Sequence, residues 1–129
     1  MKILGIGVDI IDNHRIKSLI KKKSFVNRVY SKNEIFMSKK IVNKTNFFSK
    51  RFAAKESFVK ALGIGFRNNL NFKDIEINND KLGKPYYLIK PKIKRLIKKI
   101  NKVNNFELFL SISDEKDYSV AFTIIQKKL

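Results

Sequence analysis

Apolar side chains recur at every second position near the start of the chain, which predicts a strand over residues 3–11. One face of this strand is apolar and carries Ile6, Val8 and Ile10. The opposite face carries two small residues and an acid: Gly5, Gly7 and Asp9. Glycines next to a carboxylate in a strand let another group approach the backbone closely.

Three helices are predicted after this strand, because the apolar spacing changes to a period near 3.6 residues. Asp12 or Asn13 caps the first, a short helix. Ser31 and Glu34 have the spacing of a capping box and open the second, which runs to about residue 42. The third and longest helix starts at a cap from Thr45 or Asn46 and runs to Leu62, where two glycines follow: Gly63 and Gly65.

The pattern of apolar and turn-forming residues in the rest of the chain predicts four strands and one more helix. Strands are expected at 72–77, 86–89, 106–113 and 118–125, with a turn over 80–85. Pro91 suits the first position of a helix whose apolar stripe is Ile93, Leu96, Ile97 and Ile100. The order indicates a single α+β domain over residues 1–129, with a mostly antiparallel sheet and helices packed on one side.

Cysteine is absent and His14 is the single histidine. Disulfides, thiolate nucleophiles and cysteine metal sites are therefore excluded, and a histidine-based triad or zinc site would rest on one residue. No apolar run reaches membrane-spanning length, and the first segment is too short for a signal peptide. These features favour a cytoplasmic protein that does not enter membranes.

The formal net charge of +18 indicates acidic partners. A basic nucleic-acid-binding module is one candidate class, yet such modules combine basic surface with exposed aromatic rings. Most of the 11 phenylalanines lie at positions with core periodicity, which argues against nucleic acid as the partner. Part of the charge is also explained by a composition rich in Lys, Asn and Ile, in which lysines are solvated surface.

Two acids lie where acids are unusual, inside elements and away from loops and ends: Asp9 in the first strand and Glu56 in the long helix. An acid in such a place needs a cation, which is either a nearby side chain or a metal ion. Lys60 lies four residues after Glu56 and supplies the simpler explanation, a helical ion pair. The alternative is a magnesium site of one or two carboxylates beside an ammonium for a phosphate.

Three motifs together resemble the small bacterial holo-acyl-carrier-protein synthases, a family of phosphopantetheinyl transferases. The first is GIGVDII over 5–11 with Arg15 after it, and the second is RFAAKESFVKALGIG over 51–65. The third is LSISDE over 110–115, and DIEI over 74–77 and GKP over 83–85 resemble the segment before it. The similarity spans essentially the whole chain in the same order.

The resemblance implies a magnesium-dependent enzyme that moves the phosphopantetheine arm of coenzyme A to a serine of an apo acyl carrier protein, in support of fatty acid biosynthesis. The other product is adenosine 3',5'-bisphosphate. It also implies a homotrimer with the cleft between neighbouring protomers. The sequence leaves open whether Glu56 or a bound water accepts the proton of the serine hydroxyl.

The same resemblance assigns roles to individual residues. Asp9 and Glu56 match the magnesium ligands, and Lys60 matches the lysine that contacts the pyrophosphate. The positions that match the lining of the coenzyme A cleft are Arg51, Gly63, Gly65 and Pro85. The basic residues predicted to dock an acidic carrier protein are Arg15, Lys21 and Arg28, together with neighbouring lysines, although solvated surface also explains the lysines.

Asp114 departs from the family pattern. The third motif usually reads Ser-x-Ser-His-Glu, and here an aspartate holds the histidine position. A negative charge at this position predicts altered binding of the 3'-phosphate of coenzyme A or an altered loop. It also leaves open an inactive relative that binds the carrier protein without turnover.

Overall fold

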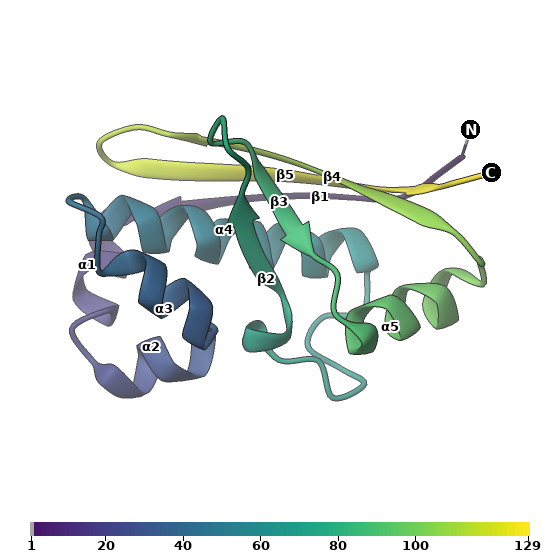
Figure 1. Cartoon of the computed structure of the whole chain (residues 1–129), viewed down its shortest axis with the longest axis horizontal. Coiled ribbons are helices and arrows are strands. Elements are labelled where there is room, and N and C mark those ends of the chain that lie inside the picture. The colour runs from purple at the N-terminus through teal and green to yellow at the C-terminus, as the bar shows by residue number, and fades with distance from the viewer. Residues whose placement is uncertain (1) are drawn as a thin grey trace.

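The computed structural model describes residues 2–129, in which five α-helices accompany a three-stranded and a two-stranded antiparallel sheet. Figure 1 shows their arrangement. The strands are β1 Lys2–Asp12, β2 Glu76–Asn79, β3 Pro85–Leu88, β4 Phe106–Asp114 and β5 Tyr118–Lys127. The helices are α1 Asn13–Leu19, α2 Lys23–Val29, α3 Lys32–Ser38, α4 Lys44–Leu62 and α5 Pro91–Asn101, with a 3₁₀ turn η1 at Phe72–Asp74.

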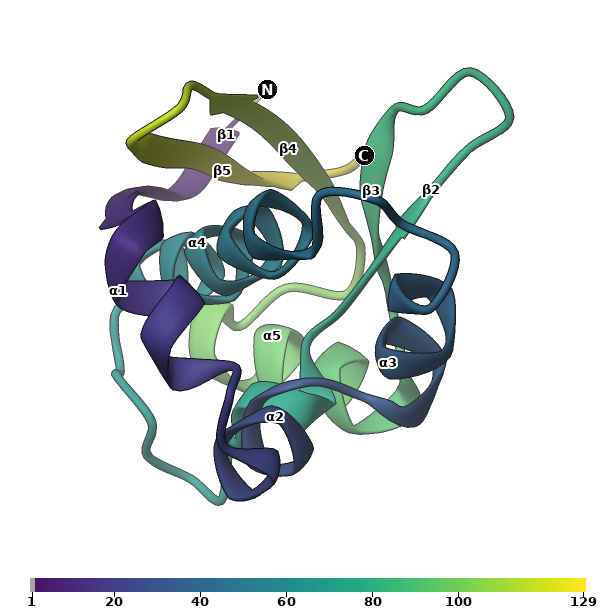
Figure 2. The same cartoon turned by 90° about the vertical axis from the view of Figure 1, so that its left-hand side faces the viewer.

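The larger sheet has the order β1-β5-β4, and the helices lie on one of its faces (Figures 1 and 2). This confirms the α+β class with helices on one side. α4 packs directly on the sheet, α2, α3 and α5 lie beyond it, and the β2–β3 hairpin runs past α4 to the edge of the sheet at β4. The expected single sheet divides in two, because β2 and β3 pair only with each other.

The other face of the larger sheet is uncovered and apolar. The cross-strand pairs Ile6–Ile124 and Val8–Phe122 place these side chains away from α4. Val8 is 54% exposed and Ile10 is 63% exposed, in line with the apolar face that the two-residue period predicted. An exposed apolar surface of this kind marks an interaction site in a soluble protein.

The long helix α4 is buried on most of its circumference and forms the centre of the core. Its N-cap is Asn43, whose side chain accepts from the Asn46 amide at 3.1 Å, so the prediction of a cap at Thr45 or Asn46 was wrong. The helix ends at Gly63 in the left-handed region (φ +81°), as predicted. Within residues 2–129, no helix is long and apolar enough to cross a membrane.

The helices between α1 and α4 differ from the prediction: one is additional, and the second predicted helix, expected to run to about residue 42, is shorter. Residues 23–29 form the separate helix α2, which has no side-chain cap and was missed; Phe25 and Val29 anchor it by burial. The capping box of Ser31 and Glu34 is confirmed at the start of α3. α3 ends already at Ser38, and the Lys44 ammonium donates to the carbonyls of Ser38 and Ile41 after it.

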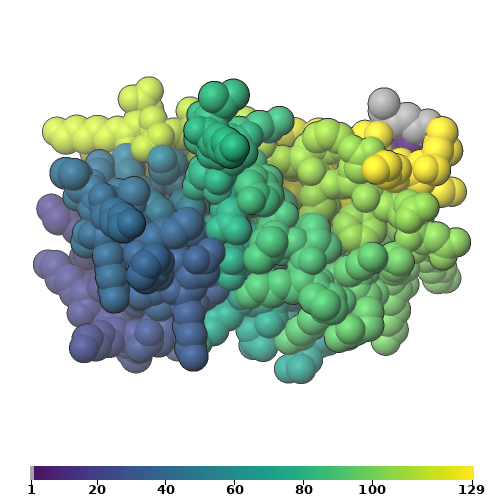
Figure 3. Space-filling model, viewed as in Figure 1, coloured from purple at the N-terminus to yellow at the C-terminus, as the bar shows by residue number. Residues whose placement is uncertain are grey.

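The strand predicted at 72–77 begins only at Glu76. Its first half forms η1, where the Asn71 amide donates to the Asp74 carboxylate at 2.9 Å and turns the chain. The predicted turn over 80–85 and the helix starting at Pro91 are both present. In the space-filling view, the tip of the β2–β3 hairpin stands out at the top of the molecule (Figure 3).

Candidate active site

Two glycines of β1 bring α4 unusually close to the sheet. A Cβ at Gly7 would lie 1.9 Å from the carbonyl oxygen of Ser57, and a Cβ at Gly5 would lie 1.9 Å from that of Ala61. Real Cβ atoms do not approach backbone atoms so closely, so only glycine fits at these two positions. The close approach places Asp9, on the same face of β1, beside the middle of α4.

Asp9 and Lys60 form an ion pair across this contact. The Lys60 ammonium donates to Asp9 Oδ1 at 3.1 Å and to the Val8 carbonyl at 3.0 Å. The Asp9 side chain is 13% exposed, whereas the Lys60 side chain is 55% exposed and reaches toward solvent. The expected helical pair between Glu56 and Lys60 is therefore replaced by a pair between strand and helix.

Glu56 lies next to this pair and is half-buried. Burial raises the pKa of the Glu56 carboxyl, and the charge of Asp9 raises it further, while Lys60 and Arg15 act in the opposite direction. Among the residues that the structure describes, no cation lies within 4.0 Å of the Glu56 carboxylate. Two neighbouring carboxylates, one of them without its own counter-ion, fit a divalent cation.

The number of protein ligands also fits magnesium rather than a closed structural metal site. Over residues 2–129, no cluster of three or more His, Cys, Asp or Glu side chains could hold a metal ion. Magnesium in enzymes is commonly held by one or two carboxylates and completes its shell with water and phosphate oxygens. Asp9 and Glu56 match this donor set.

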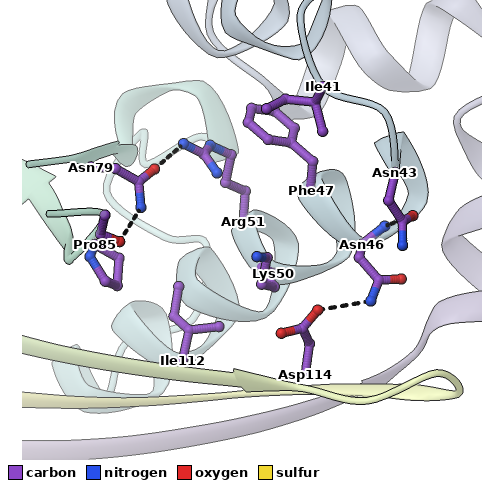
Figure 4. Close-up of a pocket in the computed structure, with 11 residues that line it drawn as sticks. Ile41, Asn43, Asn46, Phe47, Lys50, Arg51, Asn79, Pro85, Ile112 and Asp114 are labelled. Carbon is purple, nitrogen blue, oxygen red and sulfur yellow. Dashed lines mark hydrogen bonds between the residues drawn. The ribbon is translucent and has the colours of Figure 1, made fainter. Parts of the chain in front are cut away.

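A second group of predicted site residues lies at a cleft of about 380 Å³ beside the first half of α4 (Figure 4). Arg51 and Pro85 both line it. The Arg51 guanidinium lies 3.9 Å from the centre of the Phe47 ring and donates to Asn79 Oδ1 at 2.8 Å. A buried arginine and nearby Lys50 give the cleft the charge and donors for an anionic ligand.

Asp114, at the departing position of the third motif, also lines this cleft. Its carboxylate accepts a hydrogen bond from the side-chain amide of Asn46 at 2.8 Å (Figure 4). The Asn46 amide donates in addition to the Glu115 carbonyl at 3.3 Å, which holds the end of β4 against α4. The aspartate therefore brings a fixed negative charge to a cleft that is otherwise suited to anions.

Gly63 and Gly65 do not join the cleft. They follow the C-terminal end of α4, whereas Arg51 lies twelve residues before Gly63, about 18 Å along the helix axis. Both glycines have positive φ and open space where a Cβ would stand. One protomer therefore holds the predicted residues in two separate groups, one around Asp9 and Glu56 and the other around Arg51.

The predicted docking residues are exposed on the first two helices. Arg15 lies on α1, close enough to Glu56 for its charge to oppose the rise in the Glu56 pKa. Lys21 lies in the turn after α1, and Arg28 lies on α2. Sequence reasoning did not assign several residues of the cleft wall, among them Asn46, Phe47, Lys50 and Asn79. Phe47 lies four residues before Arg51 on the same helix, and this spacing is the signal that could have linked Phe47 to the site.

Comparison with known proteins gives a consistent result. The model of the 4'-phosphopantetheinyl transferase superfamily matches residues 5–123. A holo-[acyl-carrier-protein] synthase of Pelagibacter ubique is 61% identical over 128 residues, which cover 99% of this chain and all of the relative. An Orientia tsutsugamushi relative of the same name is 44% identical over 98% of this chain and 99% of its own.

Solved structures agree with the sequence comparison. The synthase of Neisseria meningitidis superposes with a TM-score of 0.88 at 35% identity, covering 98% of this chain and all of that one. A Bacillus anthracis synthase, solved in complex with CoA (3',5'-ADP), superposes with a TM-score of 0.80 at 34% identity, covering 98% of both chains.

Proposed function

Since the chain belongs to the 4'-phosphopantetheinyl transferase superfamily, we propose that it acts as a holo-acyl-carrier-protein synthase. The serine hydroxyl of an apo acyl carrier protein attacks the phosphorus that bears the pantetheine arm of coenzyme A. The new serine–phosphorus bond replaces the pyrophosphate bond, adenosine 3',5'-bisphosphate leaves, and the serine proton is released. The observation that carries the proposal is the pair Asp9 and Glu56 beside Lys60, in a chain 61% identical to a protein of that name.

Asp9 and Glu56 would hold the magnesium ion, which neutralises pyrophosphate charge and polarises the phosphorus when it is bound. Phosphoryl transfer asks a protein mainly for positioning and charge stabilisation. Lys60 is exposed and reaches across from α4, so its ammonium can turn from Asp9 to the charge that develops on the leaving bisphosphate. Arg51 and Lys50 would bind the nucleotide end of coenzyme A in the cleft.

The direct test is mass spectrometry of the carrier protein. Apo carrier protein incubated with this enzyme, coenzyme A and magnesium should gain the mass of the phosphopantetheine arm, and omission of magnesium should prevent the gain. If the mass stays unchanged while a known synthase modifies the same carrier protein, the proposed function is wrong. Binding of the carrier protein without turnover would instead favour the inactive relative.

We also propose that the two groups of site residues meet between neighbouring protomers of a homotrimer. The groups lie on different faces of α4, because Arg51 and Glu56 are five residues apart, about 140° around the helix. The uncovered apolar face of the larger sheet supplies a surface for assembly. Each complete site would combine Asp9 and Glu56 of one single-domain protomer with the Arg51 cleft of its neighbour.

Phe122→Arg is expected to dissociate this assembly and abolish activity, because it places a charge on the uncovered sheet face. Phe122 points away from α4, so each protomer should keep its circular dichroism spectrum. Sedimentation at micromolar concentration checks the result. An active monomer, whether wild type or variant, would refute the shared site.

Asp114→Asn is expected to tighten coenzyme A binding severalfold, because it removes a negative charge from the cleft and keeps the size needed to contact Asn46. The effect should be smaller for dephospho-coenzyme A, which lacks the 3'-phosphate. Titration calorimetry with both ligands measures the difference. Equal effects on the two ligands would show that Asp114 does not face the 3'-phosphate.

Arg15→Glu and Lys21→Glu are expected to raise the Michaelis constant for the carrier protein and to flatten its salt dependence, with coenzyme A affinity nearly unchanged. The reason is that rim charges act mainly on encounter with an acidic partner. Lys99→Glu on α5 is the matched control, because it changes net charge equally on another helix. An equal effect of Lys99→Glu would assign the result to net charge instead of docking.

A further inference from the structure

A fully buried ion pair joins α3 to α4 and takes no part in the chemistry described above. The Lys55 ammonium donates to Glu34 Oε1 at 2.8 Å, and both side chains are 0% exposed. Burial lowers the pKa of the Lys55 ammonium, and the Glu34 carboxylate opposes this shift. Lys55 precedes Glu56 in the chain, so one residue of α4 faces the core while the next faces the metal site.

Glu34 uses both carboxylate oxygens to connect three elements. Oε1 accepts from the Ser31 amide at 2.9 Å in addition to Lys55, which fixes the start of α3. Oε2 accepts from the Ile77 amide of β2 at 3.0 Å. The same oxygen lies 3.9 Å from Arg51 Nε. One carboxylate therefore holds α3, α4 and β2 at a common point.

Lys55 completes the connection from the other side. Its ammonium donates to the Phe72 carbonyl at 3.0 Å and to the Ile75 carbonyl. These carbonyls belong to the segment that leads into β2, so both partners of the ion pair hold the base of the β2–β3 hairpin. The hairpin in turn supplies Asn79, Gly83 and Pro85 to the wall of the cleft.

Arg51 is the functional side chain that this network reaches. The residue is 4% exposed, and its Nε is buried without a hydrogen-bond partner, so the Glu34 carboxylate at 3.9 Å is its nearest anionic neighbour. The other end of the guanidinium donates to Asn79 at 2.8 Å on the hairpin. Glu34 thus acts on Arg51 directly through charge and indirectly through the hairpin that carries Asn79.

A buried ion pair of this kind contributes little net stability, because desolvation of two charges offsets their attraction. Breaking one half is costly, whereas apolar replacement of both is often neutral. Stability alone therefore does not explain the pair, but its position at the base of the cleft wall does.

We propose that Glu34, with Lys55, is a positioning residue for coenzyme A binding: it holds Arg51 and the β2–β3 hairpin in the arrangement that accepts the nucleotide. The inference rests on the proposed function, since it takes the cleft as the coenzyme A site. Neither residue touches the reacting atoms. Loss of the pair acts on coenzyme A affinity and leaves turnover at saturation and the docking of the carrier protein unchanged.

The test compares Glu34→Gln, Lys55→Met and the double variant for melting temperature and for coenzyme A affinity by titration calorimetry. The single variants should melt well below the wild type, because each leaves a buried group without its partner. The double variant should regain most of the melting temperature. It should bind coenzyme A about tenfold more weakly, because the coupling energy between contacting residues of such a network is commonly about 1.4 kcal/mol, which is tenfold in affinity. Turnover at saturating coenzyme A and the Michaelis constant for the carrier protein should remain unchanged.

A control separates positioning from general loss of stability. Ile97→Ala on α5 removes a fully buried core side chain outside the network and should lower the melting temperature without changing coenzyme A affinity. If the double variant does not fold, Glu34→Asp takes its place, because it keeps the buried charge but retracts it by one methylene group. Coenzyme A affinity should then fall at unchanged turnover.

Wild-type affinity in a folded double variant, or in Glu34→Asp, would overturn the positioning role and leave the proposed function intact. Because calorimetry needs no turnover, this outcome is distinct from a failure of the transferase assay. If the wild type itself does not bind coenzyme A, the proposed function and the inference both fall.

Discussion

Glu56→Ala and Asp9→Ala are each expected to lower magnesium-dependent transfer by about a thousandfold or more, because each removes one of two carboxylates proposed to hold the ion that stabilises the transferred phosphoryl group. Both side chains lie at the contact of β1 with α4 and carry no part of the apolar core. The fold should therefore survive each change. Mass spectrometry of the carrier protein over time, at several magnesium concentrations, measures the loss.

The metal-free protein gives a second readout of the same site. The pKa of Glu56 is raised by burial and by Asp9, so its ionised form is disfavoured in the folded chain relative to the unfolded one. Glu56→Gln should therefore raise the melting temperature at neutral pH without magnesium. The gain should disappear as the pH falls below the ordinary glutamate pKa, where the acid is protonated in both states.

A matched control removes an acid elsewhere. Asp74→Ala breaks a partly buried ion pair with Lys92 at 2.6 Å, away from the contact of β1 with α4, and should leave the magnesium dependence of transfer unchanged. Full activity in both Asp9→Ala and Glu56→Ala would refute their assignment as ligands.

Gly7→Ala is expected to cause a large loss of stability, because the added methyl group meets backbone atoms of α4. The new Cβ would lie 1.9 Å from the Ser57 carbonyl oxygen and 2.6 Å from the Ala61 amide nitrogen, and backbone atoms cannot turn aside as a side chain can. α4 must move away from the sheet, which opens the core around it. We expect a loss of about 4 kcal/mol or more in the free energy of unfolding, since single substitutions reach such values when they overpack or disrupt a core.

Urea denaturation measures this loss, with Gly83→Ala as the control. Gly83 has a positive φ, +88°, and nothing lies within 4 Å of the position of its Cβ. Its replacement should cost only the strain of the left-handed backbone, about 1 kcal/mol. If Gly7→Ala unfolds at the wild-type urea concentration, the close contact of β1 with α4 is not present in solution.

The sequence by itself determined the local elements whose signals lie within a few residues. The two-residue period of β1, the glycine at the end of α4 and the proline at the start of α5 all predicted the structure correctly. The motifs around Asp9 and Glu56 indicated the family, and the glycines of β1 indicated a close approach to its backbone. These signals are local because they depend on backbone conformation and on which face of an element is apolar.

Only the tertiary structure decided which partners these elements meet. It paired Lys60 with Asp9 instead of Glu56, and it separated the β2–β3 hairpin from the larger sheet. It also buried Lys55 in an ion pair with Glu34. It placed Arg51 in the first half of α4, about 18 Å along the helix axis from the glycines that follow the helix. A repeating pattern states that a face is buried but not what covers it, because the covering partner comes from segments far away in the chain, brought together by close packing.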